Sequence, residues 1–116
     1  MMRRGEIRIV DLDPTRGAEA AKRRPAVVVS NDGANIAATQ LGRGVVTVVP
    51  VTSNVTRLYP FQVLLEATDT GFDRDSKAQA EQVRSVAAER LGRRTGVVPP
   101  PLMAKLDEAL RLHLAL

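Results

Sequence analysis

The sequence predicts a small, mainly β (α+β) protein, a barrel of about five or six short strands closed by one C-terminal helix. Three observations support this fold class. Short runs rich in Val and Ile are separated by segments rich in Pro, Gly and Asp. Only the segment 102–116 carries a long apolar stripe with helical spacing. A chain of 116 residues is also short enough for one domain, predicted to span 1–116.

The alternation of apolar and polar residues predicts the first strand, and a proline marks the start of the second. Apolar and polar side chains alternate over residues 7–12, as in a half-buried strand, and Pro14 ends this run. The next strand is predicted over 26–30. Pro25 suits its start, because proline lacks an N–H and forces the preceding residue, Arg24, into an extended conformation.

The middle of the chain contains two further strand signals. The polar, Gly-containing segment 31–44 is interpreted as a connection. The β-branched run VVTVVPVT at 45–52 predicts a central strand, and FQVLLEA at 61–67 predicts a fourth. The segment 68–75, TDTGFDRD, is interpreted as a turn-rich link.

The last third of the chain is predicted to end in a helix. Residues 76–86 have both helical and strand character and are interpreted as a strand that leads into a short helical turn. A last short strand is predicted over 95–98. The apolar stripe of 102–116 predicts an amphipathic helix of about 14 residues, in which Asp107 and Arg111 are spaced to form an i, i+4 pair.

Positive charge is concentrated in two parts of the sequence. Residues 1–24 hold seven cations and four carboxylates, and residues 84–94 hold four cations and one carboxylate. The stretch 25–83 between them holds four cations and six carboxylates. The cations are 14 Arg and 3 Lys, and the forked guanidinium group suits phosphate recognition. Charge alone is equally consistent with a nucleic-acid partner and with an ordinary solvated surface.

Missing residue types exclude several kinds of site. The chain has no cysteine, which excludes disulfides and thiolate metal sites. Its single histidine, His113, excludes a two-histidine ribonuclease mechanism and a His-based zinc site. No Gly-rich nucleotide-binding loop of the G-x-x-x-x-G-K-[ST] or G-x-G-x-x-G kind occurs. We therefore expect neither a metal nor a cofactor.

Two further absences concern RNA stacking and membranes. Aromatic residues make up only 3% of the chain, so a multi-aromatic platform for base stacking is not expected. The basic N-terminus lacks the apolar region of a signal peptide, and no apolar run has the length of a membrane span. A cytoplasmic protein without membrane contact is the expectation.

Ordered short motifs extend through nearly the whole chain. They are G-E-I at 5–7, V-D-L-D-P-T-R-G at 10–17 followed by Glu19, R-R-P-A-V-V-V-S-N-D at 23–32, V-P-V-T at 49–52, Y-P-F at 59–61 and E-Q-V-R-S at 81–85. In these motifs the sequence resembles the MazF toxins of bacterial toxin–antitoxin systems. The resemblance implies the SH3-like barrel with a C-terminal helix that MazF, Kid and CcdB toxins share, and a homodimer. It also implies metal-independent cleavage of single-stranded RNA to 2′,3′-cyclic phosphate and 5′-hydroxyl ends, with inhibition by a MazE-like antitoxin.

The same resemblance implies a catalytic site. Arg24 matches the arginine of the family's R-P motif, where a fixed cation can meet the charge that develops on the phosphoryl oxygens. Thr52 matches the threonine that ends V-P-V-T, and Glu19 matches the acidic residue of a G-S-E element, as general base or as orienter of Arg24. Ala18 departs from the usual Ser and removes one hydroxyl. The implied RNA-binding residues are Arg16, Arg23, Ser53, Gln82 and Arg84.

Two other functions fit parts of the sequence. A non-catalytic SH3-like RNA-binding module would also explain the basic patches. A gyrase poison on the same fold is the second alternative, but the proteins of that branch resemble one another in a Trp-containing C-terminal tail. This chain has no Trp and ends in Leu114-Ala115-Leu116. Base selection is expected in the loops 13–24, 31–43 and 53–59.

Overall fold

The computed structural model describes residues 2–116, so Met1 of the predicted domain 1–116 lies outside the described residues. One antiparallel sheet has the strand order β4-β5-β3-β2-β1-β7, and β6 pairs with β3 beside this path. The strands are β1 (Glu6–Asp11), β2 (Arg23–Val28), β3 (Val45–Thr52), β4 (Gln62–Leu65), β5 (Ser76–Gln79), β6 (Arg84–Ala87) and β7 (Leu91–Val97). The helices are α1 (Asp32–Leu41), α2 (Ala67–Thr70) and α3 (Pro100–Leu114), with 3₁₀ turns η1 (Ala80–Gln82) and η2 (Ala88–Arg90).

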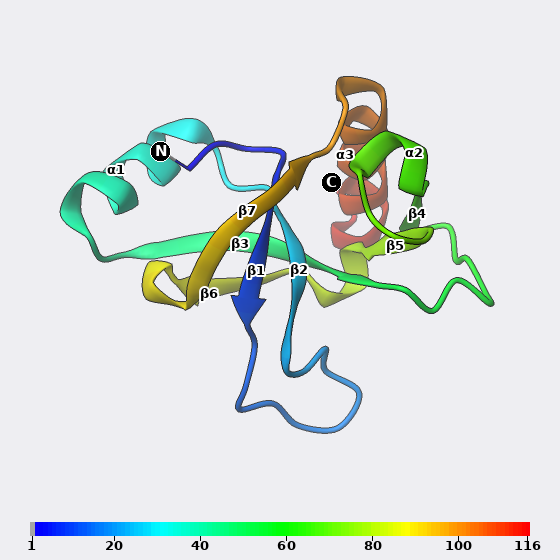
Figure 1. Cartoon of the computed structure of the whole chain (residues 1–116), viewed down its shortest axis with the longest axis horizontal. Coiled ribbons are helices and arrows are strands. Elements are labelled where there is room, and N and C mark those ends of the chain that lie inside the picture. Colours follow the sequence, from blue (N-terminus) through cyan, green and yellow to red (C-terminus); the bar gives the residue numbers. More distant parts are fainter. Residues whose placement is uncertain (1) are drawn as a thin grey trace.

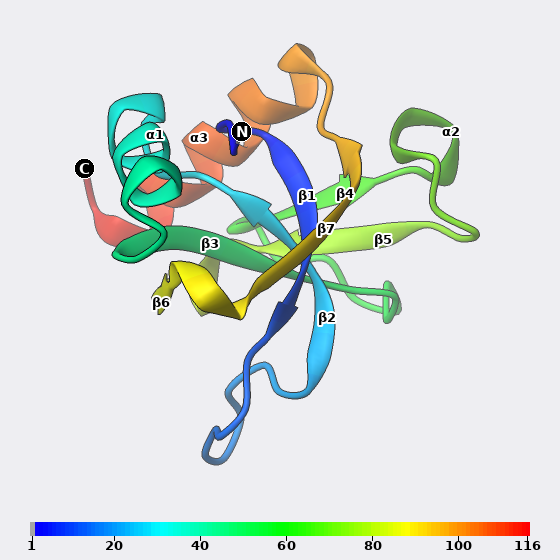
Figure 2. The same ribbon diagram turned by 60° about the vertical axis from the view of Figure 1, so that its left-hand side comes forward.

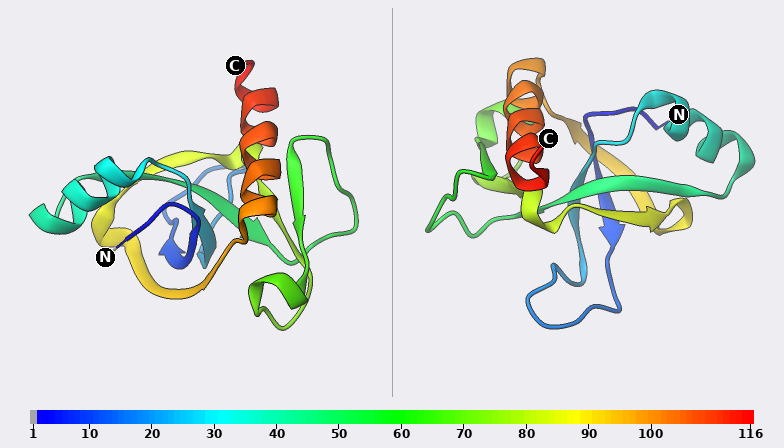
Figure 3. Two further views of the ribbon diagram at one scale, coloured as in Figure 1. Left: turned by 90° about the horizontal axis from the view of Figure 1, so that it is seen from above. Right: turned by 180° about the vertical axis from the view of Figure 1, so that it is seen from behind.

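The long strand β3 organises the sheet. One of its edges pairs with β2. The other edge is shared, because residues 45–48 pair with β6 and residues 51–52 pair with β5. The chain must therefore leave β3 between β5 and β6, and η1 makes that step. The two longer helices, α1 and α3, lie at different ends of the curled sheet (Figures 1 and 3).

Two hydrophobic cores explain why the central strands are apolar without alternation. Val27 and Val49 belong to the core that Leu106 of α3 completes. Their neighbours Val28 and Val48 face the other way, into the core that α1 covers. Successive side chains of a strand point to opposite faces, so a strand buried on both faces needs apolar residues at every position.

The predicted connection over 31–44 is wrong, because it contains the helix α1. Asn31 precedes the helix, and its side-chain oxygen accepts a hydrogen bond from the backbone N–H of Ala34. Gly42 ends the helix in the left-handed region, with a φ of 64°. Both are ordinary cap residues. Only one apolar side chain of the helix, Ala38, is fully buried, so the apolar periodicity that normally predicts a helix is weak here.

Several predicted strand bounds also need correction. The strand predicted over 76–86 is two strands, β5 and β6, separated by η1, because the chain pairs with β3 twice. The strand predicted over 95–98 begins earlier, at Leu91, and the one predicted over 26–30 begins at Arg23. The helix α2 occupies the start of the predicted link 68–75.

The C-terminal helix α3 is confirmed, but the predicted pair of Asp107 and Arg111 is wrong. Asp107 instead pairs with Arg4, with 2.5 Å between Arg4 Nη2 and Asp107 Oδ1, and Arg111 pairs with Glu108. Arg4 also donates to the Val29 carbonyl, so it ties the N-terminal segment to β2 and α3 together. No helix within residues 2–116 combines the length and apolar character needed to cross a membrane.

The predicted fold class is confirmed, with a barrel that is not fully closed. In the described part of the chain, β4, β6 and β7 each pair with only one other strand, so the sheet keeps free edges. The helix α2 approaches β7 at Gly96, where a Cβ atom would lie 2.8 Å from the Thr70 carbonyl oxygen. Glycine is therefore needed at Gly96 for this approach. The curl of the sheet and the long β1–β2 loop are visible in Figure 2.

Candidate functional site

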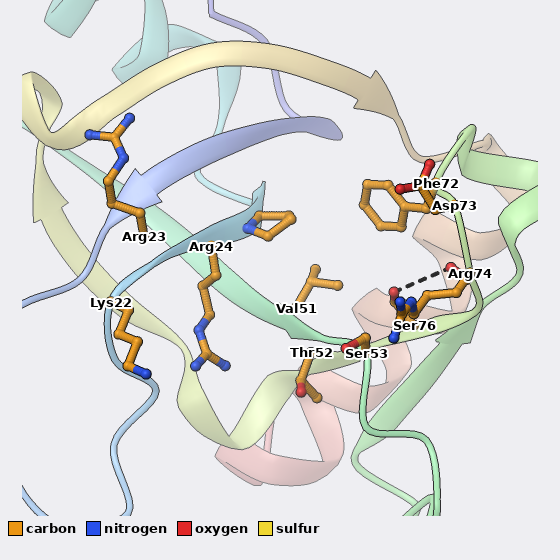
Figure 4. A pocket seen from close by; sticks show the side chains of 11 residues that line it. Lys22, Arg23, Arg24, Val51, Thr52, Ser53, Phe72, Asp73, Arg74 and Ser76 are labelled. Carbon is orange, nitrogen blue, oxygen red and sulfur yellow. Dashed lines mark hydrogen bonds between the residues drawn. The ribbon is translucent and has the colours of Figure 1, made fainter.

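A basic pocket lies between β2, the end of β3 and the link from α2 to β5 (Figure 4). Its volume is about 370 Å³, within the range of small-ligand sites. Four of its side chains are cations and one is a carboxylate, so the pocket favours an anion. The lining residues are Lys22, Arg23, Arg24, Pro25, Val51, Thr52, Ser53, Phe72, Asp73, Arg74 and Ser76.

Arg24 is held at the pocket by the strand β2 and by one hydrogen bond. Its backbone pairs with Val10 of β1, and the following Pro25 keeps it extended, as the sequence predicts. Nε donates to the Ala21 carbonyl oxygen over 2.8 Å. Within residues 2–116 neither terminal nitrogen has a hydrogen-bond partner. The guanidinium group is therefore oriented while both of its outer nitrogens stay available for a ligand.

Thr52 reaches the same pocket from the last position of β3. Its hydroxyl oxygen accepts a hydrogen bond from the Asn54 backbone N–H over 3.2 Å. A hydroxyl has one hydrogen to donate, and this contact does not use it. Thr52 can therefore donate to a phosphate oxygen. Ser53 is the next residue along the pocket wall, and it is exposed.

The cationic side chains around Arg24 point in different directions (Figure 4). The amine of Lys22 and the guanidinium of Arg24 point toward the same side, on which the Thr52 hydroxyl also lies. The Arg23 side chain points away from both. A Cβ atom on Gly92 would lie 3.7 Å from Arg23 Nη2, so this side chain extends toward β7.

Glu19 and Arg16 lie in the β1–β2 loop and do not line the pocket. Glu19 Oε1 accepts a hydrogen bond from the backbone N–H of Arg16 over 2.9 Å, so the carboxylate stabilises its own loop. Among the described residues no ion pair joins Glu19 to Arg24. A role for Glu19 as base or as orienter of Arg24 stays a prediction.

Gln82 and Arg84 contact the same loop from the other side. The Gln82 amide donates to the Ala18 carbonyl and accepts from the Ala20 N–H, both over 2.9 Å. Arg84 donates from Nη1 to the Leu12 carbonyl over 3.2 Å. Both side chains therefore fasten the loop to η1 and β6. Neither lines the basic pocket, and RNA contacts by either stay a prediction.

Beside Pro25 and Val51, five polar or aromatic pocket residues were missed by the sequence analysis. Ser76 is the first residue of β5, and three others come from the segment between α2 and β5, which the sequence presents as an ordinary turn-rich link. Its position opposite β2 depends on the pairing of β5 with β3, which no local pattern encodes. The fifth is a lysine in a run of cations. These residues are Lys22, Phe72, Asp73, Arg74 and Ser76.

Residues 3–114 match the family described as PemK-like, MazF-like toxins of type II toxin–antitoxin systems. The chain belongs to this toxin family. The endoribonuclease MazF9 of Mycobacterium tuberculosis is 68% identical over 116 residues, which cover 100% of this chain and 98% of that relative. The predicted family resemblance is thereby confirmed.

Solved structures of toxins in this family have the same fold. MazF from Deinococcus radiodurans aligns with a TM-score of 0.82 and 26% identity, over 99% of this chain and 97% of that one. A mycobacterial endoribonuclease solved with its cognate antitoxin aligns with a TM-score of 0.78 and 24% identity, over 100% and 97% of the two chains. The second likeness bears on the fold alone.

Proposed function

We propose that this PemK/MazF-family toxin is a sequence-specific endoribonuclease that cleaves single-stranded RNA. The observation that carries the proposal is the position of Arg24 and Thr52, which the chain brings to one basic pocket from β2 and β3. The 68% identity to MazF9, an endoribonuclease, supports the same activity. The positive charge of the pocket suits the phosphate backbone of RNA.

The proposed chemistry uses the RNA 2′-hydroxyl as the nucleophile. Its oxygen attacks the adjacent phosphorus, and negative charge grows on the two non-bridging oxygens. The outer nitrogens of Arg24 and the hydroxyl of Thr52 donate hydrogen bonds to those oxygens, which stabilises the transition state. The bond to the 5′-oxygen then breaks. The products are a 2′,3′-cyclic phosphate and a 5′-hydroxyl.

Cleavage without a metal ion is part of the proposal. Arg24 already supplies positive charge at the phosphate and Thr52 adds a hydrogen bond, and stabilising charge at the phosphate is one task that a metal ion performs in other nucleases. Residues 2–116 contain no cluster of three or more His, Cys, Asp or Glu side chains placed to hold a metal ion.

One experiment tests both parts of the proposal. The toxin is incubated with a long unstructured RNA in excess EDTA, and the ends of the fragments are mapped and analysed chemically. We expect cuts at a short recurring sequence, with cyclic phosphate and 5′-hydroxyl ends. Binding without fragments would favour a non-catalytic RNA-binding module. Fragments that disappear in EDTA would contradict metal independence.

We also propose that an antitoxin blocks the pocket. The positive charge around Arg24 favours an acidic, disordered segment that folds over the basic pocket on binding. The mycobacterial endoribonuclease of similar fold was solved with its cognate antitoxin. RNA cleavage that continued while the cognate antitoxin was bound would contradict this model. A cytoplasmic location, where RNA and antitoxin would meet the toxin, follows from the same proposal, and cell fractionation tests it.

A further inference from the structure

Lys22 occupies an unusual position at the edge of the basic pocket. It is the last loop residue before β2, and its backbone has a φ of 69°. A residue with a Cβ atom adopts this left-handed conformation at an energetic cost, so the surrounding contacts must hold it there. The Lys22 N–H donates to Asp13 Oδ1 over 3.0 Å, and its carbonyl accepts from the Leu12 N–H over 3.0 Å. These contacts hold Lys22 against the residues that follow β1, and the side chain reaches the pocket beside Arg24 (Figure 4).

The other pocket cations cannot transfer a proton. Arg23, Arg24 and Arg74 carry guanidinium groups, which do not lose their proton in proteins. The only acidic side chain of the pocket, Asp73, is a carboxylate. His113, near the end of α3, does not line the pocket. Among the described lining residues, the Lys22 ammonium is thus the one cationic group able to give up a proton.

The proposed cleavage creates a need for such a group. When the bond between phosphorus and the 5′-oxygen breaks, that oxygen leaves as an alkoxide unless it takes up a proton. A positioned general acid supplies this proton, and lysine is one of the side chains that act as general acids. Arg24 stabilises the charge on the non-bridging oxygens, but it does not protonate the 5′-oxygen.

We propose that Lys22 is the general acid of the RNA cleavage reaction, an inference that rests on the proposed endoribonuclease function. The 2′-hydroxyl passes its proton to water as the bond between the 2′-oxygen and phosphorus forms. The bond from phosphorus to the 5′-oxygen breaks, and that oxygen takes a proton from the Lys22 ammonium. The neutral amine then regains a proton from water. The net change is one proton moved from the 2′-oxygen to the 5′-oxygen.

A sulfur-bridged substrate tests this role directly. The cut site is first mapped with the wild-type toxin, and an oligonucleotide is then made with sulfur in place of the 5′-oxygen at that linkage. A thiolate leaves without protonation, so cleavage of this substrate does not need an acid. We expect Lys22→Met to slow single-turnover cleavage of the oxygen substrate by about 10²-fold or more. The same variant should cleave the sulfur substrate at nearly the wild-type rate.

Further variants separate proton transfer from charge and from folding. Lys22→Arg keeps the positive charge but cannot donate a proton, so it should resemble Lys22→Met on the oxygen substrate. Lys22→Gly suits the positive φ and guards against misfolding, and it should show the same rescue by sulfur. Arg24→Ala should stay slow on both substrates. Arg93→Met removes an exposed cation of β7 outside the pocket, so it is the control and should cleave both normally.

Several results would overturn the assignment. Equal losses of Lys22→Met on the two substrates would mean that Lys22 only binds phosphate. Full activity of Lys22→Met or of Lys22→Arg on the oxygen substrate would also remove it as the acid. These outcomes are distinct from a failure of the proposed function, in which the wild-type toxin would cleave neither substrate.

Discussion

At the scale of single residues, the neighbours of Arg24 in the sequence restrict the direction of its side chain at the pocket. Arg24 is extended because a proline follows it, and its Nε is bound by the Ala21 carbonyl. Both constraints reduce the number of directions in which the guanidinium group can point. A preorganised cation loses less entropy when it meets a phosphate, which makes it an effective group for stabilising a transition state.

Replacement of Arg24 should therefore affect catalysis more than folding or binding. We expect Arg24→Ala to slow single-turnover cleavage by about 10²-fold or more, the scale for losing one transition-state contact. Arg24→Lys should restore little of the rate, because an ammonium group cannot make the forked contact. Affinity for a 2′-deoxy analogue should fall much less, because the other cations still bind the backbone. Equal losses of rate and affinity would show that Arg24 only binds.

Gln82 is a residue whose importance comes from the loop that it holds. We expect Gln82→Ala to raise the rate of amide hydrogen exchange in residues 13–22 by about 10-fold, because two hydrogen bonds to this loop are lost. Cleavage should also slow, since the loop leads into Lys22 and Arg24. Gln40→Ala, at an exposed position of α1, is the control and should change neither rate. Unchanged exchange in the loop would show that Gln82 does not hold it.

At the scale of elements, the helix α1 shows how a short helix depends on its ends. It buries little apolar surface of its own, with Asn35 and Ala38 as its buried residues. Asn35 donates to the Ser30 carbonyl over 2.8 Å, and this contact ties the helix to the end of β2. A short helix is marginal without such tertiary contacts and caps.

The cap residue Asn31 should therefore contribute measurably to stability. We expect Asn31→Ala to lower the free energy of unfolding by about 1 kcal/mol, since the Ala34 N–H loses its partner. Asn31→Ser keeps an acceptor at the same position and should retain most of the stability. Urea denaturation followed by circular dichroism measures both. Equal stability of the two variants would mean that the cap contributes nothing beyond the backbone conformation.

At the scale of the whole molecule, apolar and basic surfaces are separate. The basic pocket lies where β2, β3 and the α2–β5 link meet. A groove of about 660 Å³, more apolar in its lining, runs along β4 and α3 between Leu58 and Leu112. Leu58 is 51% exposed and Leu112 is 57% exposed, and Leu114 and Leu116 follow at the end of the chain. Clustered exposed leucines indicate a surface that a partner covers.

A homodimer that uses this surface is the corresponding prediction. We expect the wild-type toxin to sediment as a dimer at micromolar concentration, and Leu112→Glu to sediment as a monomer because a buried carboxylate would lack a partner. Leu41→Glu changes a leucine that is even more exposed, at 67%, but lies on α1. It should leave the dimer intact. A monomeric wild type would contradict the prediction, and a dimeric Leu112→Glu would place the interface elsewhere.

Local patterns in the sequence determined most of the elements and the first residues of the site. β-branched runs, the proline after Arg24 and the apolar stripe of α3 act on their near neighbours, so they predicted the strands and the C-terminal helix correctly in kind. The resemblance to MazF toxins singled out Arg23, Arg24, Thr52 and Ser53, and these four residues share a pocket. Only the tertiary structure decided which other side chains join them.

The register of β5 on β3 brings Phe72, Asp73 and Arg74 to the pocket. Hydrogen bonds to the residues that follow β1 hold Lys22 there. The tertiary structure also shows that the Glu19 carboxylate accepts a hydrogen bond within its own loop instead of pairing with Arg24. Pairing between strands that are distant in sequence is selected by the burial of two whole cores, so no short segment of the sequence encodes it.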